Sequence, residues 1–365
     1  MMSSFGMIWC FGAAFAMLLS LSCARAGALE FSAAGTFKIL QLTDLHFGAD
    51  RGGDARTRKL MIALIDRENP DLVVLSGDVV TGDAWKVSDG TKKGWFENQW
   101  DHAVSPMTER GVPYAMILGN HDTQAYLGAD AIVAYDMGGE FSLTQGRDYY
   151  LDVGTTHRIW FFDSGNDRCH GRKSWGCVRE EAIEWAREQT PAAFSVAFVH
   201  IPIPQMSPGY LKDKKGERHE PVSSARTDAG VMRFATEQGV RGIFHGHDHG
   251  NDYAGVTKKE GVMLAYGRST GYGGYTVDRM AKGARVIVLR QNASHALPET
   301  WILLEDGNRV DYNGFSDIYA RNVREFMVVA TIFFVCACVA VWWAMRVTRC
   351  DHRRSSVEPD GVHLI

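Results

Sequence analysis

Five short apolar runs along the chain are each followed directly by a polar segment containing Asp, Asn or His. The runs are rich in branched aliphatic residues, which predicts buried strands. They are Phe37–Leu42, Leu72–Leu75, Tyr114–Leu118, Val196–Val199 and Gly242–Phe244. Open α/β sheets place their sites at the carboxyl ends of strands. We therefore expect the five polar segments to meet at one edge of the fold.

Helical spacing of apolar residues separates these predicted strands. It indicates helices over Thr57–Arg67, Trp95–Met107, Arg179–Gln189 and Ser224–Gln238, the last ending before Gly239 as a helix C-cap does. Later runs predict further strands over Val262–Tyr266, Arg285–Leu289 and Thr300–Leu304. Alternation first and strands later predicts an α/β fold of two stacked sheets flanked by helices.

The polar segments supply the oxygen and nitrogen donors that bind hard and borderline divalent metals. They are Asp44-Leu45-His46, Gly77-Asp78, Gly119-Asn120-His121-Asp122, His200 and Gly246-His247-Asp248-His249. Any one of them alone is more often a turn or a satisfied surface histidine. Five in register at strand ends predict a site for two metal ions, which the Asp78 carboxylate can bridge.

Both ends of the chain are apolar. The run 5–21 is followed by Ala24-Arg25-Ala26, a small-x-small pattern suited to signal peptidase, with the mature chain starting near Gly27. Residues 1–6 carry no Lys or Arg, which leaves an uncleaved signal anchor as the alternative. We expect a signal peptide over residues 1–26.

The second apolar run, Phe326–Met345, is long enough to cross a bilayer as a helix, and it ends near Trp342 and Trp343. Four arginines follow it and two precede it, which places the tail in the cytosol. We expect a main domain over 27–322, a transmembrane helix over 323–346 and a cytosolic tail over 347–365. This organisation predicts a single-pass type I membrane protein of the secretory pathway or cell surface, with its main domain lumenal or extracellular.

Cysteine use and charge agree with export of the main domain. That domain keeps only Cys169 and Cys177, which we expect to form a disulfide in an oxidising compartment rather than a zinc site with His170. Asn292-Ala293-Ser294 is a glycosylation sequon. The net charge is −4 and no Lys/Arg cluster alternates with aromatics, so we expect no nucleic-acid partner.

Two stretches have the composition of loops over a site. Met206–Pro221 is polar and follows His200, while Gly267–Tyr275 is Gly-rich with aromatic and cationic members. We expect the second loop to contact substrate through Arg268 and Tyr272.

Together the five polar segments resemble those of the calcineurin-like metallophosphoesterase superfamily in order and residue type, from Phe37 to about Asp252. His200-Ile201-Pro202-Ile203-Pro204 and Gly246–Tyr253 further resemble the plant and fungal branch similar to purple acid phosphatases. The resemblance implies a four-layer α/β/β/α sandwich of two mixed sheets, with the site at one edge of the sandwich.

The resemblance also implies roles for individual residues. One metal would be held by Asp44, His46, Asp78 and His249, and the other by Asp78, Asn120, His200 and His247. A hydroxide bridging the ions would attack phosphorus in line, His121 would assist the leaving oxygen, and Asp122 would orient the His121 ring. The two ions would be manganese, zinc or iron.

One position departs from the purple acid phosphatases, which carry an iron-binding tyrosine in a Gly-Asp-x-x-Tyr segment. Here Gly77-Asp78-Val79-Val80 is followed by Thr81, so we expect no tyrosinate–iron site. The expected activity is hydrolysis of phosphomonoesters on a small-molecule or protein substrate. A phosphodiesterase or nucleotide hydrolase, and a receptor-like module without turnover, are the alternatives.

Overall fold

The computed structural model describes residues 28–86, 93–277, 280–293, 296–313 and 339. The chain divides into two units, Met1–Ser316 and Asp317–Ile365, and all elements below belong to the first. Within the described residues, no helix is long and apolar enough to cross a membrane. The predicted signal peptide lies outside these residues, as does all but one residue of the predicted span.

The first sheet has six strands and is mixed. The central strand β1 pairs parallel with β2 and antiparallel with β13, and β2 pairs parallel with β3. The strand order is β15 (Arg309–Asp311), β14 (Glu299–Leu304), β13 (Gly283–Arg290), β1 (Thr36–Leu42), β2 (Leu72–Ser76) and β3 (Tyr114–Ile117). The carboxyl ends of β1, β2 and β3 therefore lie together at one edge.

The second sheet has seven strands, of which β5, β8, β10 and β12 run parallel to one another. The strand order is β4 (Tyr149–Val153), β5 (His157–Phe162), β8 (Phe194–Val199), β10 (Val240–His245), β12 (Met263–Tyr266), β11 (Ala254–Thr257) and β9 (Leu211–Lys215). A separate two-stranded hairpin joins β6 (Arg168–Cys169) to β7 (Arg172–Lys173).

The two sheets pack face to face around an apolar core. Phe37 and Ile39 of β1 and Phe161 and Phe198 of the second sheet are at most 1% exposed and belong to one buried cluster. A side chain on alternate positions of a strand points to the opposite face, so Leu40 and Leu42 join a different cluster beneath the helices. This alternation explains why both faces of β1 are apolar.

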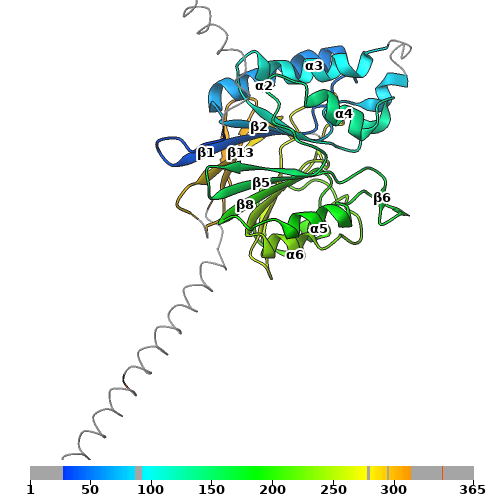
Figure 1. The fold of residues 1–365 in the computed structure, drawn as a ribbon. Coiled ribbons are helices and arrows are strands. Elements are labelled where there is room, and N and C mark those ends of the chain that lie inside the picture. Colours follow the sequence, from blue (N-terminus) through cyan, green and yellow to red (C-terminus); the bar gives the residue numbers. More distant parts are fainter. Residues whose placement is uncertain (1–27, 87–92, 278–279, 294–295, 314–338, 340–365) are drawn as a thin grey trace, which may run out of the picture. The chain divides into compact units, whose positions relative to one another are not determined.

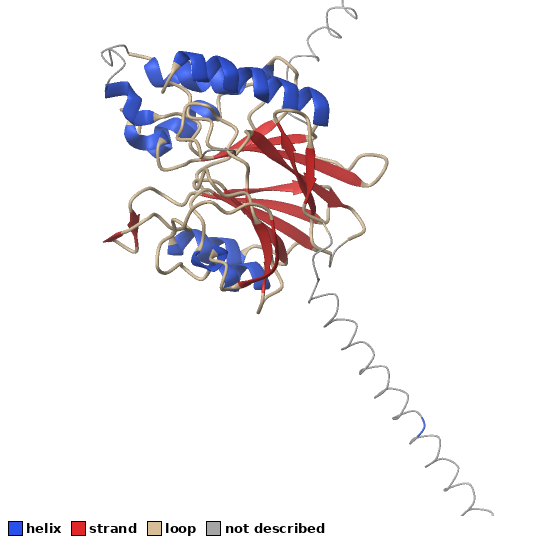
Figure 2. Ribbon diagram, turned by 180° about the vertical axis from the view of Figure 1, so that it is seen from behind, coloured by secondary structure: helices blue, strands red, loops and turns tan. Residues whose placement is uncertain are grey.

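Helices cover the outer faces of both sheets (Figures 1 and 2). The first sheet carries α2 (Arg51–Glu68), α3 (Trp95–Thr108) and α4 (Ala129–Asp136), and the second carries α5 (Glu180–Glu188) and α6 (Val231–Glu237). Three short 3-10 turns complete the pattern, η1 (Gly82–Lys86), η2 (Asp122–Gln124) and η3 (Pro204–Met206). The prediction of two mixed sheets with helices outside is confirmed.

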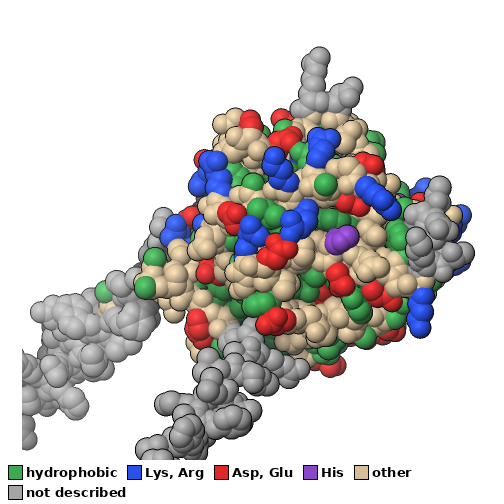
Figure 3. All heavy atoms as spheres, turned by 90° about the horizontal axis from the view of Figure 1, so that it is seen from above, with side chains coloured by type: hydrophobic (Ala, Val, Ile, Leu, Met, Phe, Trp, Pro, Cys, Tyr) green, Lys and Arg blue, Asp and Glu red, His purple; other side chains and the backbone are tan. Residues whose placement is uncertain are grey.

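The outer surface above α2 and α3 mixes acidic and basic side chains rather than gathering one sign (Figure 3). Arg58 pairs with Glu109, and Arg110 pairs with Asp66, so two ion pairs join these helices. Such exposed pairs contribute little to stability.

Two predicted helices start at other residues than the sequence pattern indicated. The first, α2, begins at Arg51 rather than Thr57, and the last, α6, begins at Val231 rather than Ser224. Asp228 accepts hydrogen bonds from the backbone N–H of Gly230 and Val231, and this turn occupies the stretch that was predicted as helix. Gly239 follows α6 with φ +66°, as the C-cap prediction expected.

Candidate metal centre

Loops after five strands meet at one edge of the two sheets. Asp44 and His46 follow β1, Asp78 follows β2, and Asn120 follows β3; from the second sheet, His200 follows β8, and His247 and His249 follow β10. A cavity of about 450 Å³ opens there, and its wall includes His46, Asp78, Asn120, His121, His247 and His249. Asp44 and His200 are at most 1% exposed and contribute donors from behind this wall.

The predicted ligands form two groups. Asp44, His46 and His249 bring their donor atoms within 4.8 Å of one another, and Asp78, His200 and His247 do the same. Oδ2 of Asp78 lies 3.2 Å from Nε2 of His200 and 3.8 Å from Nε2 of His46. Asp78 therefore reaches both groups, which is the position that a bridging carboxylate needs.

The backbone is strained at four of these residues. Asp44, His46, Asp78 and His247 have φ between 51° and 76°, in the left-handed region that residues other than glycine rarely adopt. Such conformations cost free energy and persist where the surrounding structure requires them, often at functional sites. The sharp turns aim successive side chains from one loop into the same space.

Gly77 allows the close approach of the two sheets at this point. It has φ +96°, and a Cβ there would lie 2.3 Å from Nδ1 of His200. Any side chain at this position would displace the histidine or Asp78, which follows in the chain.

Hydrogen bonds orient three of the four histidines. Nδ1 of His200 lies 2.8 Å from the carbonyl oxygen of Ser76, and Nδ1 of His249 lies 2.8 Å from that of Tyr275. Nδ1 of His46 lies 3.0 Å from Oγ1 of Thr81. With Nδ1 engaged, Nε2 of each ring is the nitrogen available to a metal ion, as in many metal sites.

Buried charge in the centre is balanced within each group. Burial by itself would lower the pKa of His200, but the Asp78 carboxylate outweighs burial and raises this pKa to about 10. Burial likewise would lower the pKa of His249, and the Asp44 carboxylate raises it. Each group thus pairs one carboxylate with one histidine whose pKa that carboxylate raises.

The remaining two histidines are neutral donors. Burial lowers the pKa of both His46 and His247 to about 3. Burial would raise the pKa of Asp78, but the charge of His200 holds it well below its ordinary value. The carboxylates are therefore ionised and His46 and His247 offer lone pairs on nitrogen, the states in which these side chains bind metals, whereas His200 must first lose its proton.

The residues fit a pair of divalent cations. Among the described residues, the buried atom Oδ1 of Asn120 has no hydrogen-bond partner, although Asn120 lines the centre. Buried polar atoms left unpaired cost free energy unless a ligand satisfies them. Mixed carboxylate, amide and imidazole donors suit manganese, zinc and iron.

His121 lies beside the centre, but its predicted partner is wrong. Both oxygens of Asp122 accept backbone N–H groups, from Val80 and Gly119, at 2.8 Å each. Nδ1 of His121 instead lies 2.9 Å from Oε1 of Gln124. Asp122 thus fixes the loops that carry Asp78 and Asn120, and Gln124 orients the His121 ring.

The two predicted substrate contacts are also wrong. Arg268 is 4% exposed and pairs with Asp252 at 2.5 Å, and it is not part of the cavity wall. Tyr272 packs against the guanidinium of Arg56 and its hydroxyl pairs with Glu305, also away from the cavity. A buried arginine needs a carboxylate partner, which explains why Arg268 points into the protein.

The structure also describes the two predicted disulfide cysteines and Asn292 of the predicted glycosylation sequon. Cys169 and Cys177 are joined by a disulfide. Asn292 is exposed in the turn after β13. Eight residues of the cavity wall were not among the predicted site residues, namely Thr81, Asp83, Trp175, Ser223, Asp248, Gly273, Gly274 and Tyr275. Gly273, Gly274 and Tyr275 lay in the Gly-rich stretch predicted as a site loop, and Asp248 lay between two predicted ligands.

Comparisons with known proteins agree with this geometry. Residues 37–251 match the family model described as calcineurin-like phosphoesterase. The chain is 27% identical over 338 residues to a protein named probable inactive purple acid phosphatase 28 from Arabidopsis thaliana, covering 76% of this chain and 83% of that one. It is also 27% identical over 317 residues to probable inactive purple acid phosphatase 14 from the same plant, covering 71% and 76%.

A solved structure shares the fold. The crystal structure of a dimetal phosphatase from Danio rerio superposes with a TM-score of 0.52 at 13% identity, covering 76% of this chain and 99% of that one. The fold of two mixed sheets is therefore shared with a protein of very different sequence.

Proposed function

The chain belongs to the calcineurin-like phosphoesterase family, and we propose that it hydrolyses phosphomonoesters at this centre with two divalent cations as cofactors. The observation that carries the proposal is the pair of donor groups joined by Asp78, with Asn120 completing the set. Two cations held there supply Lewis acidity that activates water and offsets phosphate charge.

The chain's own residues have separate tasks in this proposal. Asp44, Asp78 and the four histidines hold the cations, and the strained loops keep these side chains in place before substrate arrives. His121 lies on the cavity wall with Nδ1 at Oε1 of Gln124, so Nε2 of its imidazolium form would be the nitrogen that gives a proton to the leaving oxygen.

The two Arabidopsis relatives are named as probable inactive phosphatases, and the residues of this chain's centre indicate whether the same description suits this chain. Thr81 stands where the purple acid phosphatases carry an iron-binding tyrosine, so a ferric tyrosinate site is not expected. Every other predicted donor is present and faces the same centre. These donors support turnover with two divalent ions, without the colour of a tyrosinate complex.

A second candidate function is hydrolysis of phosphodiesters or nucleotides. Its support is the cavity wall, where the described structure places no Lys or Arg. A diester carries one negative charge where a monoester carries up to two, and so needs less positive charge from the protein.

The test uses the full chain in detergent, stripped of metal and then supplied with manganese, zinc or ferrous iron. We expect metal-dependent hydrolysis of p-nitrophenyl phosphate that is lost in Asp78→Asn. Faster turnover of bis-p-nitrophenyl phosphate would select the diesterase. Two bound metals with no turnover of either ester would favour a receptor-like module.

We propose in addition that the catalytic domain lies in the lumen of the secretory pathway or outside the cell, anchored by a single helix over 323–346. The support is the uncharged run 326–345 with arginines after it, and the disulfide, which is typical of oxidising compartments. Exposed Asn292 gives the test, because glycosidase treatment should reduce the apparent mass of wild type and leave Asn292→Gln unchanged.

A further inference from the structure

Two aromatic side chains stand at the cavity wall, each against a histidine of the metal centre. The ring of Tyr275 lies parallel to that of His249 with centroids 4.0 Å apart, and the ring of Trp175 meets His247 edge-on at 4.5 Å. Trp175 is 43% exposed and Tyr275 is 51% exposed. Among the exposed aromatic side chains of the described residues, Trp175 and Tyr275 line the cavity.

The two rings differ in what they can offer a ligand. One face of Tyr275 is covered by His249, and its hydroxyl accepts the His249 backbone N–H and pairs with Glu220. The rings of Trp175 and His247 meet T-shaped at 78°, so His247 covers at most part of one indole face and none of the other. Trp175 is therefore the ring better placed to receive a flat ligand group.

A rigid hairpin places Trp175. The backbone N–H of Ser174 donates to Asp167, and that of Gly176 donates to Asn166, so the residues on both sides of Trp175 are bonded across the hairpin. A Cβ on Gly176 would lie 2.2 Å from the carbonyl oxygen of Ser164, so the hairpin packs tightly on the end of β5.

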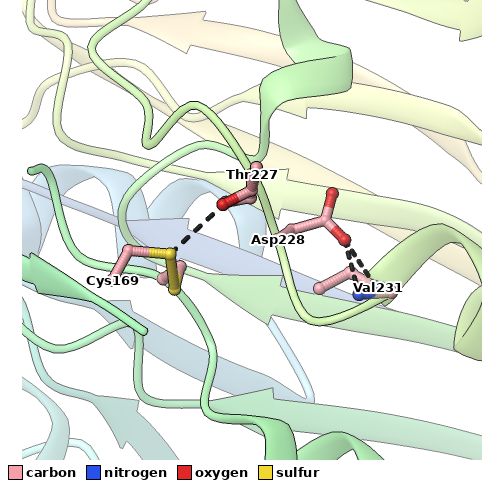
Figure 4. The surroundings of a disulfide bond; sticks show 6 residues. Cys169, Thr227, Asp228 and Val231 are labelled. Carbon is pink, nitrogen blue, oxygen red and sulfur yellow. Dashed lines mark hydrogen bonds between the residues drawn. A yellow bond between two sulfur atoms is a disulfide. The ribbon is translucent and has the colours of Figure 1, made fainter. Parts of the chain in front are cut away.

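The disulfide closes the hairpin and lies against a second segment of the chain. It joins Cys169 to Cys177, and Sγ of Cys169 lies 3.4 Å from the carbonyl oxygen of Thr227 (Figure 4). Asp228 holds the next turn by accepting the N–H groups of Gly230 and Val231. Trp175 is thus held in place before any ligand binds, which reduces the entropy lost on binding.

The cavity has room for more than a phosphate group, but the described part of its wall has no Lys or Arg to bind one. Its volume of about 450 Å³ falls in the range of sites for whole small molecules. With no Lys or Arg on the described wall, recognition beyond the metal ions must come largely from aromatic and small polar groups.

We propose that Trp175 determines specificity by stacking on the leaving group, and that the preferred substrates are phosphate esters whose leaving group contains a flat ring. This inference rests on the proposed function. The shared chemistry is a planar aromatic group near the phosphate, which an aryl phosphate or a nucleotide would supply.

The test measures each substrate with the metal-loaded full chain and with each metal-loaded variant. Because wild type and variant are compared on the same substrate, the acidity of the leaving group does not affect the comparison. For Trp175→Ala we expect kcat/KM to fall roughly tenfold with phenyl phosphate, through KM, and to change little with ethyl phosphate. Trp175→Phe should keep most of the activity. Tyr210→Ala, which removes a ring that is 56% exposed and outside the cavity, is the matched control.

Adenosine monophosphate and ribose 5-phosphate form the second pair of substrates. A loss in Trp175→Ala confined to the nucleotide would identify the base as the stacked ring, and a loss confined to phenyl phosphate would identify an aryl ester. In both pairs, an equal loss for the substrate with a flat ring and the substrate without one would overturn the proposal. No loss of activity with any substrate would also overturn it.

A binding measurement separates this inference from the proposed function. We expect the metal-loaded chain to bind phenylphosphonate more tightly than methylphosphonate by calorimetry, and Trp175→Ala to lose that preference. The phosphonates are not hydrolysed, so this result does not depend on turnover. A chain that turns over no ester but shows the preference would refute the proposed function alone, and an unchanged preference in Trp175→Ala would refute the role of Trp175.

Discussion

The hydroxyl oxygen of Thr81 lies 3.0 Å from Nδ1 of His46, while Nε2 of the same ring lies 3.1 Å from Nε2 of His249. Thr81 therefore occupies the far side of a metal ligand, at the sequence position where the purple acid phosphatases have a tyrosine. Its hydroxyl can accept the Nδ1 proton and so keep Nε2 free for the metal.

Removing that hydroxyl should weaken one metal site. In Thr81→Val we expect the affinity of the site containing His46 to fall by about 10- to 100-fold, because the ring loses the partner that fixes its orientation. Titration of the metal-free protein with zinc measures this. Thr81→Ser is the control and should stay close to wild type; equal affinity in the valine variant would show that the hydroxyl has no such part.

Metal binding should release protons. His200 has its pKa raised to about 10, so it is charged near neutral pH in the metal-free protein, and the pKa of His249 is also raised. Filling the group that contains His200 must displace the proton of that ring, and affinity should rise with pH up to the pKa of His200. Calorimetric titrations in buffers of different ionisation enthalpy count the released protons, and a buffer-independent heat would contradict the assignment.

His121 should affect turnover more than binding. In His121→Ala we expect kcat to fall by about 10²- to 10⁴-fold with a poor leaving group such as an alkyl phosphate. The fall should be smaller with p-nitrophenyl phosphate, whose leaving oxygen needs little protonation. Gln124→Ala should give a smaller effect of the same kind, since it only orients the ring. Equal losses for both leaving groups would argue against a proton donor.

The disulfide should stabilise the hairpin that carries Trp175. Cys169 and Cys177 are eight residues apart, and closing so short a loop contributes roughly 2–3 kcal/mol to the free energy of unfolding. The double variant Cys169→Ser, Cys177→Ser should unfold at lower denaturant concentration and lose the preference for ringed phosphonates. Preserved preference in a folded double variant would mean that the hairpin's other contacts suffice.

Stability should change with pH in opposite directions at two acidic residues of α2. Burial raises the pKa of Asp54 to about 6, so the folded state favours its protonated form, and its contribution is lost as the pH rises through about 6. Asp66 pairs with Arg110, which lowers its pKa, so its contribution is present above the unfolded pKa and lost in acid.

Melting temperatures measured from pH 4 to pH 8 test the direction in which each residue changes stability with pH. Relative to wild type, Asp54→Asn should gain stability toward pH 8, and Asp66→Asn should lose it. A parallel response of the two variants would contradict the burial argument for Asp54.

The meeting of the candidate metal ligands at one edge could be predicted from the sequence because these residues obey a local rule. Asp44, Asp78 and His200 each follow a buried strand within a few residues, and parallel strands bring their carboxyl ends together. Arg268 followed no such rule, since its direction is decided by Asp252 across the fold.

Trp175 was missed for a similar physical reason. It lies in a hairpin with no periodic pattern, and a disulfide and contacts to Ser164 and Thr227 determine its place. The same holds for the start of α6, where the turn at Asp228 competes with a helical pattern of apolar residues.

The most direct test of the account is a metal titration of the metal-free full chain, with bound metal and hydrolysis of p-nitrophenyl phosphate followed together. The account predicts two ions per chain, activity that appears as the second site fills, and loss of this activity in Asp78→Asn. Full activity with a single ion, or unchanged activity in Asp78→Asn, would contradict a centre in which Asp78 joins two metal sites.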